Sequence, residues 1–338
     1  MCKKVFLTGV TGQSGSYLSE ILLKNGYDVN GLMRRGSTFT TERIEHLLDN
    51  ENFNLHYGDL SDGLNLYHLI EKIQPDYIIN AGAMSHVFVS FQIPIYCMDV
   101  TGTAVVRLLE AIKQINTKIK FIQFSSSEMF GNCGDTILTE TSPMQPCSPY
   151  AIAKYMGYLT TKHYRDAYGI WASNAIFFNM ESQRRGHTFV TKKICDYIIK
   201  IKNHPDIIKT IQPLQLGNLD AMRDWGSCEE YMDGVYRMMQ MKNCDDILFA
   251  TGETHSVKEF CTEAFKEIGI TIFWGKDPND KILGLDNDTG KTLIETNDRL
   301  KRPLELNFLC GNPKKAEEKL GWIPKTKFKD LIKLMIKE

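Results

Sequence analysis

The stretch VFLTGVTGQSG, residues 5–15, decides the fold. A short apolar run ends at Thr8 and passes into a turn with glycines at positions 9, 12 and 15. Such glycines let a backbone approach a pyrophosphate closely, and the amides that open the next helix attract its charge. The spacing G-x-x-G-x-x-G differs from G-x-G-x-x-G, and a tight strand-to-helix connection alone would also use these glycines. Its place between a predicted strand and a predicted helix favours a dinucleotide site.

Apolar runs typical of buried strands alternate with segments of helical periodicity through the first half of the chain. The predicted strands cover residues 5–8, 28–33, 53–57, 77–80 and 120–124. The predicted helices cover residues 17–25, 64–73 and 103–115. Alternation of this kind predicts an α/β fold, a Rossmann-type doubly wound parallel sheet with helices on both faces.

The pattern loosens after about residue 180, which predicts a second, smaller body. We expect residues 1–180 to form the dinucleotide-binding domain and residues 181–338 to form mainly a C-terminal α/β substrate-binding domain. Segments near 215–255 are expected to rejoin the first domain, because residues 247–251 again have the pattern of a strand. A helix is predicted over 190–202, and two amphipathic helices flank the turn Gly321–Pro324.

Composition excludes several classes of protein. The 40 basic and 41 acidic side chains give a net charge of -1, which argues against nucleic-acid binding. No stretch approaches the ~18 apolar residues that cross a bilayer, and the start lacks a signal-peptide cleavage site. The nine cysteines are scattered without a C-x-x-C pair, so we expect reduced thiols, no metal site and a cytoplasmic protein.

The end of the second predicted strand indicates which nicotinamide dinucleotide is bound. Arg34 and Arg35 stand where an NAD-binding domain usually carries Asp or Glu, and the first acid is Glu42. Paired guanidinium groups suit the 2′-phosphate of NADP, although two solvated loop arginines are the alternative. Asp59 and Leu60 follow the third strand and are expected near the adenine; a helix N-cap is the other reading of Asp59.

Tyr150 and Lys154 lie one helical turn apart, on one face of a predicted helix. A lysine ammonium beside a phenol favours the phenolate, which can then accept a proton from a hydroxyl. With 14 tyrosines in the chain a chance match is expected, and Tyr158 with Lys162 is a second one. We predict that Tyr158 and Lys162 are an exposed helical pair, because Ser148 and Pro149 mark Tyr150 as the start of the helix.

Ser126 and Glu128 follow the fifth predicted strand, where ligands bind in an open parallel sheet. A dehydrogenase that only transfers hydride needs Ser, Tyr and Lys, but it has no use for Glu128. A buried carboxylate there could abstract a proton next to a ketone, which favours elimination over simple oxidation. The alternatives are a polar turn for the serines and an acid at a helix N-terminus for Glu128.

Taken in order, the motifs resemble one family. They are GVTGQSGSYL (9–18), HYGDLSD (56–62), NAGAMSHVFVSF (80–91), SSSEMFG (125–131), SPYAIAK (148–154), FNMESQRRG (178–186), FVTKK (189–193), LGNLDAMRDWG (216–226) and LGW (320–322). This series, with Arg34 and Arg35, resembles the GDP-mannose 4,6-dehydratases of the extended short-chain dehydrogenase/reductase type, over nearly the whole chain.

The resemblance implies an NADP-dependent hydro-lyase that converts GDP-mannose to GDP-4-keto-6-deoxymannose, an early step towards deoxysugars of the GDP-fucose or GDP-rhamnose type. Catalysis would rest on Ser126, Glu128, Tyr150 and Lys154. The implied NADP contacts are Gly9, Val10, Thr11, Gly12, Gln13, Ser14, Gly15, Arg34, Arg35, Asp59, Leu60, Ala81, Gly82, Ala83, Met84, Ser85, Tyr96, Lys154, Met180 and Arg185. The implied contacts to the nucleotide sugar are Ser85, Ser90, Asn179, Lys193, Arg223 and Arg302.

Some positions depart from the family pattern: Ser14 for Asp, Ser126 for Thr, Met180 for His, Gln183 for Pro and His187 for Glu. Met180 removes a polar contact to the cofactor, whereas Ser126 keeps the hydroxyl. The resemblance further implies a homodimer or homotetramer. The alternatives are a dehydratase or reductase for a dTDP- or UDP-sugar, and a non-catalytic NADP-binding sensor on the same fold.

Overall fold

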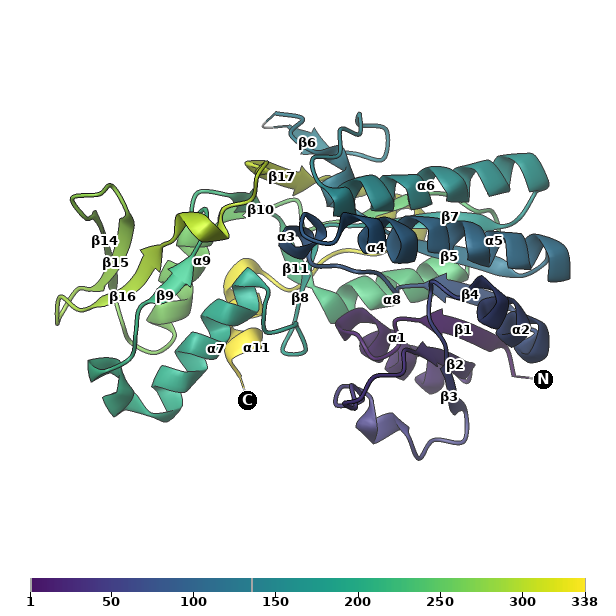
Figure 1. Cartoon of the computed structure of the whole chain (residues 1–338), viewed down its shortest axis with the longest axis horizontal. Coiled ribbons are helices and arrows are strands. Elements are labelled where there is room, and N and C mark those ends of the chain that lie inside the picture. The colour runs from purple at the N-terminus through teal and green to yellow at the C-terminus, as the bar shows by residue number, and fades with distance from the viewer. Residues whose placement is uncertain (1, 135, 338) are drawn as a thin grey trace.

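A seven-stranded parallel sheet forms the centre of the larger body (Figure 1). The computed structural model describes residues 2–134 and 136–337. The strand order is β12-β7-β5-β4-β1-β2-β3, so the order reverses beside β1. The strands are β1 (Lys4–Thr8), β2 (Asp28–Met33), β3 (Phe53–Tyr57), β4 (Tyr77–Asn80), β5 (Lys120–Ser126), β7 (Ala172–Phe177) and β12 (Ile247–Phe249).

Helices cover both faces of this sheet, which confirms the predicted Rossmann-type fold. Side chains alternate along β1: Val5 and Leu7 are buried towards one face, whereas Phe6 is buried towards the other. The first face packs against α1 (Gln13–Lys24) and α8 (Cys228–Met239). The second face packs against α2 (Gly63–Ile73), α5 (Ala104–Ile115) and α6 (Pro149–Tyr168).

Several predicted boundaries differ from the structure, and two of them bear on the cavity described below. Helix α1 begins at Gln13, four residues before the predicted start, because the glycine turn itself supplies the N-cap at Gly12. Strand β5 continues to Ser126, so Ser125 and Ser126 end the strand, and Ser127 begins the 3-10 helix that follows. Between β4 and α5 lie α3 (Val87–Ser90), α4 (Pro94–Met98) and a π-helical turn over Asp99–Thr103.

The smaller body packs three helices against a four-stranded sheet of order β14-β15-β16-β9. The helices are α7 (Val190–Asn203), α9 (Val257–Lys266) and α11 (Phe328–Ile336). The strands are β14 (Ile272–Lys276), β15 (Ile282–Asp286), β16 (Thr292–Thr296) and β9 (Leu214–Leu216). At the left of Figure 1 this body stands apart from the large sheet, and the chain passes between the two bodies several times.

Short elements join the two bodies. One small sheet has the order β13 (His255–Ser256), β10 (Met222–Arg223), β17 (Phe308–Gly311) and β6 (Ile137–Leu138). Another pairs β8 (Asn179–Glu181) with β11 (Trp225–Ser227). Helix α10 (Lys314–Leu320) precedes α11, as predicted for the two C-terminal helices. The 3-10 helices are Glu45–Leu47, Ser127–Phe130, Pro205–Lys209 and Asp298–Leu300. No helix in the described ranges is long and apolar enough to cross a bilayer.

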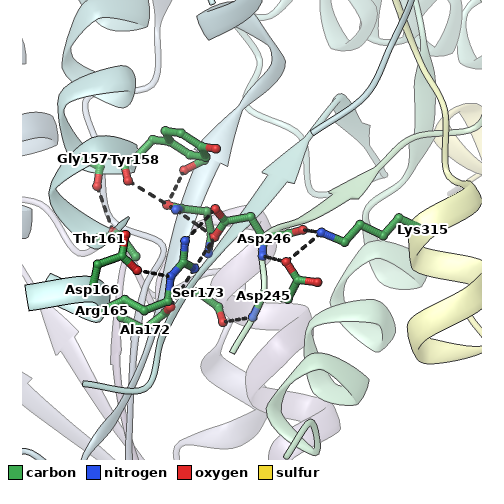
Figure 2. A network of polar contacts seen from close by, with 12 residues as sticks. Gly157, Tyr158, Thr161, Arg165, Asp166, Ala172, Ser173, Asp245, Asp246 and Lys315 are labelled. Carbon is green, nitrogen blue, oxygen red and sulfur yellow. Dashed lines mark hydrogen bonds and ion pairs between the residues drawn. The ribbon is translucent and has the colours of Figure 1, made fainter. Parts of the chain in front are cut away.

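A buried polar network holds the C-terminal half of α6 to β7 and to the start of β12 (Figure 2). Arg165 donates from Nη1 and Nη2 to the two carboxylate oxygens of Asp246, at 2.9 and 3.1 Å. Asn174 donates to Asp246 from its backbone and its side-chain amide, and Lys315 of α10 pairs with Asp245 at 2.7 Å. This network is a structural anchor for α6.

The prediction that Tyr158 and Lys162 form an exposed pair is wrong for Tyr158. The side chain of Tyr158 is 5% exposed and packs in an apolar cluster with Ile176 and Leu248. Helix α6 lies against the sheet along its whole length, so the face that carries Tyr158 points inward. Lys162 is only half-buried, with its ammonium 5.5 Å from the centre of the Tyr158 ring.

Candidate active site

A cavity of about 700 Å³ opens beyond the carboxyl ends of β1, β4 and β5, between the two bodies. Its walls come from the glycine turn, the segment after β4, the end of β5, the start of α6, helix α7 and the 3-10 turn near residue 300. This is the position at which ligands bind in open α/β sheets, beside the reversal of strand order. Its volume suits a ligand larger than a single sugar.

The glycine turn is shaped as a cradle for an anion. Gly9 has φ +68°, and a Cβ there would lie 2.8 Å from the backbone nitrogen of Gly82. A Cβ on Gly15 would lie 2.2 Å from the carbonyl oxygen of Gly9, so neither position accepts a side chain. Gly12 is the N-cap of α1 and offers no capping side chain, and the first turn carries no acid. The helix therefore presents its amides to the cavity, which fits a dinucleotide pyrophosphate.

The structure brings most of the predicted turn residues to the cavity wall. Gly9, Thr11, Gly12, Gln13 and Ser14 line it, whereas Val10 and Gly15 are buried beneath the turn. Gln13 also ties the turn to β8 and the segment after it. Its side-chain amide donates to the carbonyl of Met180 at 3.1 Å, and its oxygen accepts from Ser182 at 2.8 Å.

The predicted contacts around β2 and β3 lie at the rim, outside the cavity. Arg34 donates from Nη1 to the hydroxyl of Tyr96 at 2.8 Å, so two of the predicted residues meet. The guanidinium of Arg35 lies over the rings of Phe39 and Tyr57, 5.7 Å from each centre. Both arginines are exposed.

Asp59 and Leu60 lie where β3 ends, near the segment after β4. Burial acts to raise the pKa of Asp59, but two hydrogen bonds from Ser61 and the charges of Arg34 and Arg107 lower it below its usual value. A Cβ on Gly82 would be 2.8 Å from Cδ1 of Leu60, so Gly82 leaves room for that side chain.

The segment after β4 supplies the next part of the wall. Ala81, Gly82, Ala83 and Ser85 line the cavity, whereas Met84 turns away and its backbone N–H donates to Thr101 at 3.1 Å. The structure does not bring Ser90 to the cavity. Its side chain is fully buried and donates to the carbonyl of Val87 at 2.6 Å. A contact between Ser90 and a sugar therefore stays a prediction without geometric support.

The four predicted catalytic residues meet in one part of the cavity. Ser126 ends β5, Glu128 lies on the 3-10 helix that follows, and Tyr150 and Lys154 lie on the first turns of α6. Ser148 caps α6, since its hydroxyl accepts from the backbone N–H of Ala151 at 3.1 Å, and Pro149 occupies the first helical position. This start fixes which face of α6 points into the cavity.

Burial shifts the pKa of both members of the Tyr150 and Lys154 pair. It raises the pKa of the Tyr150 phenol well above its usual value, and the Ser126 side chain opposes this only in part. Burial lowers the pKa of Lys154 to about 8. The Lys154 ammonium lies 5.8 Å from the centre of the Tyr150 ring and donates to the carbonyl of Phe124 at 2.6 Å. The protein alone thus keeps Tyr150 protonated, and activation of the phenol by Lys154 stays a prediction.

Glu128 faces a cationic part of the cavity. Its Oε1 lies 3.4 Å from Nη1 of Arg302, and its backbone N–H donates to the Ser126 hydroxyl at 3.2 Å. The carboxylate is nearly buried, with 12% of its side chain exposed. It occupies the first turn of a short helix, as the alternative reading proposed, yet its side chain points into the cavity. Its position in the first turn of a helix is thus confirmed, whereas its role as a base stays a prediction.

Three of the predicted substrate cations line the same cavity. Arg223 is 6% exposed and donates to the carbonyl of Met222; burial lowers its pKa, and the charge of Glu128 opposes this. Lys193 of α7 donates to the carbonyl of Gln215 at 3.2 Å, and burial lowers its pKa as well. Together with Arg302 they bring positive charge to the wall of the cavity. Asn179, Met180 and Arg185 also line the cavity.

Several residues of this wall were not predicted from the sequence, and three of them are polar side chains that bear on the site. Glu181 is buried, accepts from Thr191 at 2.6 Å and pairs with Arg185 at 3.3 Å; burial raises its pKa. The ring of His86 lies 5.3 Å from that of Phe189. Glu305 accepts the backbone N–H of Arg302 at 2.7 Å. His86 and Glu181 lie inside recognised motifs and could have been found there, but no sequence signal marked Glu305.

Comparison with protein families and curated relatives gives one consistent result. A family model described as GDP-mannose 4,6 dehydratase matches residues 6–335. GDP-mannose 4,6 dehydratase 2 of Caenorhabditis elegans is 43% identical over 99% of this chain and 88% of its own length. The human GDP-mannose 4,6 dehydratase is 42% identical, over 98% and 89%. The Vibrio cholerae GDP-mannose 4,6-dehydratase is 41% identical, over 100% and 94%.

Solved structures are similar in fold. The dTDP-glucose 4,6-dehydratase DesIV of Streptomyces venezuelae, with NAD and TYD bound, superposes with a TM-score of 0.81 at 18% identity, covering 98% of this chain and 95% of that one. The UDP-glucose 4-epimerase of Thermus thermophilus, in complex with NAD, gives a TM-score of 0.80 at 20% identity, covering 98% and 97%. At this level of identity the likeness shows the fold alone.

Proposed function

The chain belongs to the GDP-mannose 4,6-dehydratase family, and from this premise we propose how its residues carry out the reaction and which cofactor they hold. The reaction converts GDP-D-mannose to GDP-4-keto-6-deoxy-D-mannose with loss of one water. The observation that carries the proposal is the meeting of Glu128 with Ser126, Tyr150 and Lys154 in one cavity. A carboxylate beside the Ser, Tyr and Lys set allows elimination to follow oxidation at the same site.

Tyr150 is proposed to accept the proton from the hydroxyl on carbon 4 of the mannose. Ser126 would hydrogen-bond the same oxygen, and the Lys154 ammonium would stabilise the phenolate as it forms. The glycine turn and the segment after β4 would hold a nicotinamide dinucleotide, which would supply hydride transfer from carbon 4 to carbon 6 with no net redox change. Since burial raises the pKa of Tyr150, the phenol must release its own proton before it can accept one from the hydroxyl, and we propose that the Lys154 ammonium favours the phenolate that does so.

Glu128 is proposed to take the proton from carbon 5, which the ketone at carbon 4 makes acidic. The same carboxyl group would then give a proton to the hydroxyl that leaves carbon 6 as water. In this role the residue must be ionised before the step and protonated within it. Oε1 of Glu128 lies 3.4 Å from Nη1 of Arg302, so the two side chains form an ion pair in the cavity.

We propose NADP as the cofactor. The support is Arg34 and Arg35 at the end of β2, both exposed at the rim, with no acid before Glu42. The hydrogen bond from Arg34 to Tyr96 leaves Nη2 and Nε of that guanidinium for a phosphate. Charge reversal in Arg34→Glu should weaken NADP binding by at least about tenfold and leave NAD binding within about threefold. Equal losses for both cofactors would contradict the choice of NADP.

The proposed contacts to the nucleotide sugar lie across the cavity from the glycine turn. Lys193, Arg223 and Arg302 would face the diphosphate, and Asn179 would lie beside them. On this proposal residues 181–338 supply most of the sugar-nucleotide site and residues 1–180 most of the cofactor site. We further propose a homodimer or homotetramer; exposed Ile152 and Leu159 on α6, 45% and 47% exposed, are compatible with an interface.

The decisive experiment follows GDP-mannose by mass spectrometry during incubation with the purified protein and catalytic NADP. The expected result is the loss of one water, which Glu128→Gln abolishes while the fold and NADP affinity stay unchanged. An unchanged mass, with NADP binding demonstrated, would reject GDP-mannose as substrate. In that case dTDP- and UDP-sugars would be tested in the same assay.

A further inference from the structure

A row of polar side chains crosses the centre of the large sheet below the cavity. Thr8 of β1, Asn80 of β4 and Gln123 of β5 are all 0% exposed. They are also in register, with Thr8 opposite Asn80 and Asn80 opposite Gln123. Central strands of a sheet covered on both faces normally carry apolar residues, and a buried amide without partners is costly. Such a row therefore calls for a physical reason.

Hydrogen bonds join the row into one chain. The backbone N–H of Gly82 donates to Thr8 Oγ1 at 2.9 Å, and Thr8 donates to Asn80 Oδ1 at 2.6 Å. Asn80 Nδ2 donates to Gln123 Oε1 at 2.8 Å. Gln123 Nε2 then donates to the carbonyl oxygen of Phe124 at 3.0 Å. We call this chain, from Gly82 through Thr8, Asn80 and Gln123 to Phe124, the amide ladder.

The two ends of the amide ladder fix its direction. A backbone N–H can only donate, so the Thr8 hydroxyl accepts from Gly82 and donates its own proton to Asn80. The carbonyl of Phe124 can only accept, so Gln123 must turn its NH2 group towards it. Neither amide can then flip without setting two donors or two acceptors against each other. Bonds aligned in one direction also polarise and strengthen one another.

The carbonyl at the end of the ladder also accepts the Lys154 ammonium. Lys154 Nζ lies 2.6 Å from the oxygen of Phe124, the same oxygen that accepts from Gln123. We propose that Gln123 is a positioning residue for Lys154: by holding one side of the Phe124 carbonyl, it fixes where the ammonium sits beside Tyr150. Asn80 and Thr8 hold Gln123 in the required orientation.

The ladder begins where the cofactor site begins. Gly82 lines the cavity beside the glycine turn, and a Cβ on Gly9 would touch its nitrogen. Three side chains from neighbouring strands therefore join the wall of the cofactor site to the Phe124 carbonyl, which accepts the Lys154 ammonium. This assignment rests on the proposed function only for the role of Lys154; the geometry of the ladder is independent of it.

The first test compares Gln123→Met, which keeps the length of the side chain but cannot donate or accept, with the wild type. Lysine labelled with 13C at the ε carbon reports the titration of Lys154 by NMR, and Lys154→Met assigns the signal. Without Gln123 the Phe124 carbonyl no longer shares its lone pairs with a second donor, so its hydrogen bond to the Lys154 ammonium strengthens. The pKa of Lys154 should therefore rise by about half a unit or more. In the dehydratase assay kcat should fall by about tenfold or more, with KM within about threefold.

The second test uses Gln123→Glu, which is close to isosteric. A neutral carboxyl group can still donate from its hydroxyl to Phe124, but an ionised one can only repel that carbonyl. The activity relative to wild type should therefore be greatest at acidic pH and fall as the introduced group ionises. This variant also keeps the proposal testable if Gln123→Met does not fold, which thermal unfolding by circular dichroism would show.

Ser173→Ala is the matched control. Ser173 is equally buried in the same sheet, but its hydroxyl accepts from Asp245 in the anchor network of Figure 2. It should leave the titration of Lys154 and kcat unchanged. An unshifted Lys154 signal in Gln123→Met, or a pH-independent activity ratio for Gln123→Glu, would overturn the proposal. Because the NMR titration needs no turnover, an inactive wild type would reject the proposed function without deciding the role of Gln123.

Discussion

The two ends of helix α6 are held in different ways. At the C-terminal end, Arg165 and Asp246 match donors to acceptors, and Asp246 accepts four hydrogen bonds from Arg165 and Asn174 (Figure 2). At the N-terminal end, Lys154 has one hydrogen bond in the described part of the chain, to Phe124. An ion pair whose donors and acceptors are all matched stabilises the fold. An ammonium with unused N–H donors can instead form hydrogen bonds to a ligand. Changes at the two ends should therefore affect different properties.

The largest expected effect belongs to the active end. Tyr150→Phe removes the proposed proton acceptor and should lower kcat by about a thousandfold or more, with little change in stability. Steady-state dehydration of GDP-mannose and thermal unfolding would be measured on the same preparation. A variant that lost stability in proportion to activity would break the comparison, because Tyr150 would then be holding the helix in place.

At the anchored end the expectation is reversed. Asp246→Asn removes the buried counter-ion of Arg165 and leaves only the exposed Asp166, 3.6 Å away, so it should cost about 3 kcal/mol of unfolding free energy. Urea denaturation measures the loss, and kcat of the folded enzyme should stay within about twofold of wild type. A large fall in kcat without destabilisation would mean that the anchor also positions Tyr150.

The pH dependence of stability tests the lysine directly, in protein free of cofactor. Burial lowers the pKa of Lys154 to about 8, so between pH 8 and the unfolded value of ~10.5 the folded state binds fewer protons than the unfolded state. The contribution of Lys154 to the free energy of unfolding therefore rises with pH between these two values. Below pH 8 the cost of burying the charged ammonium applies in full.

Replacing that lysine by an apolar side chain should remove the penalty. Lys154→Met should be more stable than wild type by about 2 kcal/mol at pH 7, after the lost hydrogen bond is counted, and the difference should shrink towards pH 10.5. Denaturation curves at several pH values would show this. A difference that stayed constant with pH would place the Lys154 pKa at its ordinary value.

The smallest effect is expected at the second tyrosine of α6. Burial raises the pKa of Tyr158 to about 12, with the neighbouring Asp246 charge acting in the same direction, and the residue lies on the anchored half of the helix. Tyr158→Phe should cost about 1 kcal/mol or less of stability and leave kcat unchanged. A marked loss of activity would show that Tyr150 is not the unique catalytic tyrosine of this helix.

Local signals predicted much of this molecule. The glycine turn at 9–15 and the strands of the first half follow from motifs and periodicity that span a few residues each. Glu128 and Tyr150 belong to separate motifs, and their meeting was expected because ligands bind beyond the carboxyl ends of the strands. The burial of Tyr158 did not follow, because it depends on how α6 lies on the sheet. Ser90 was placed by family resemblance, and its short helix turns its hydroxyl to Val87 instead.

The amide ladder could not be predicted for a related reason. Thr8, Asn80 and Gln123 are far apart in the chain, and only the register of β1, β4 and β5 makes them neighbours. A single polar residue in a strand pattern suggests an exposed edge or an error in assignment. That the three residues form one hydrogen-bonded chain can be recognised only when the strand order is known.

The register extends the polar row by one more residue, with Gln123 opposite Asn174 of β7, which belongs to the anchor network. No hydrogen bond joins these two amides in the described ranges, since Gln123 turns to Phe124 and Asn174 to Asp246. The row is thus divided into two independent units. Within the ladder, an apolar substitution at Asn80 or Gln123 leaves the other amide without its hydrogen-bond partner. We therefore expect the protein to tolerate apolar residues at these positions only when both change together. During evolution, residues of the amide ladder would then change in pairs. Such paired changes would leave the anchor network around Asn174 and Asp246 unaffected.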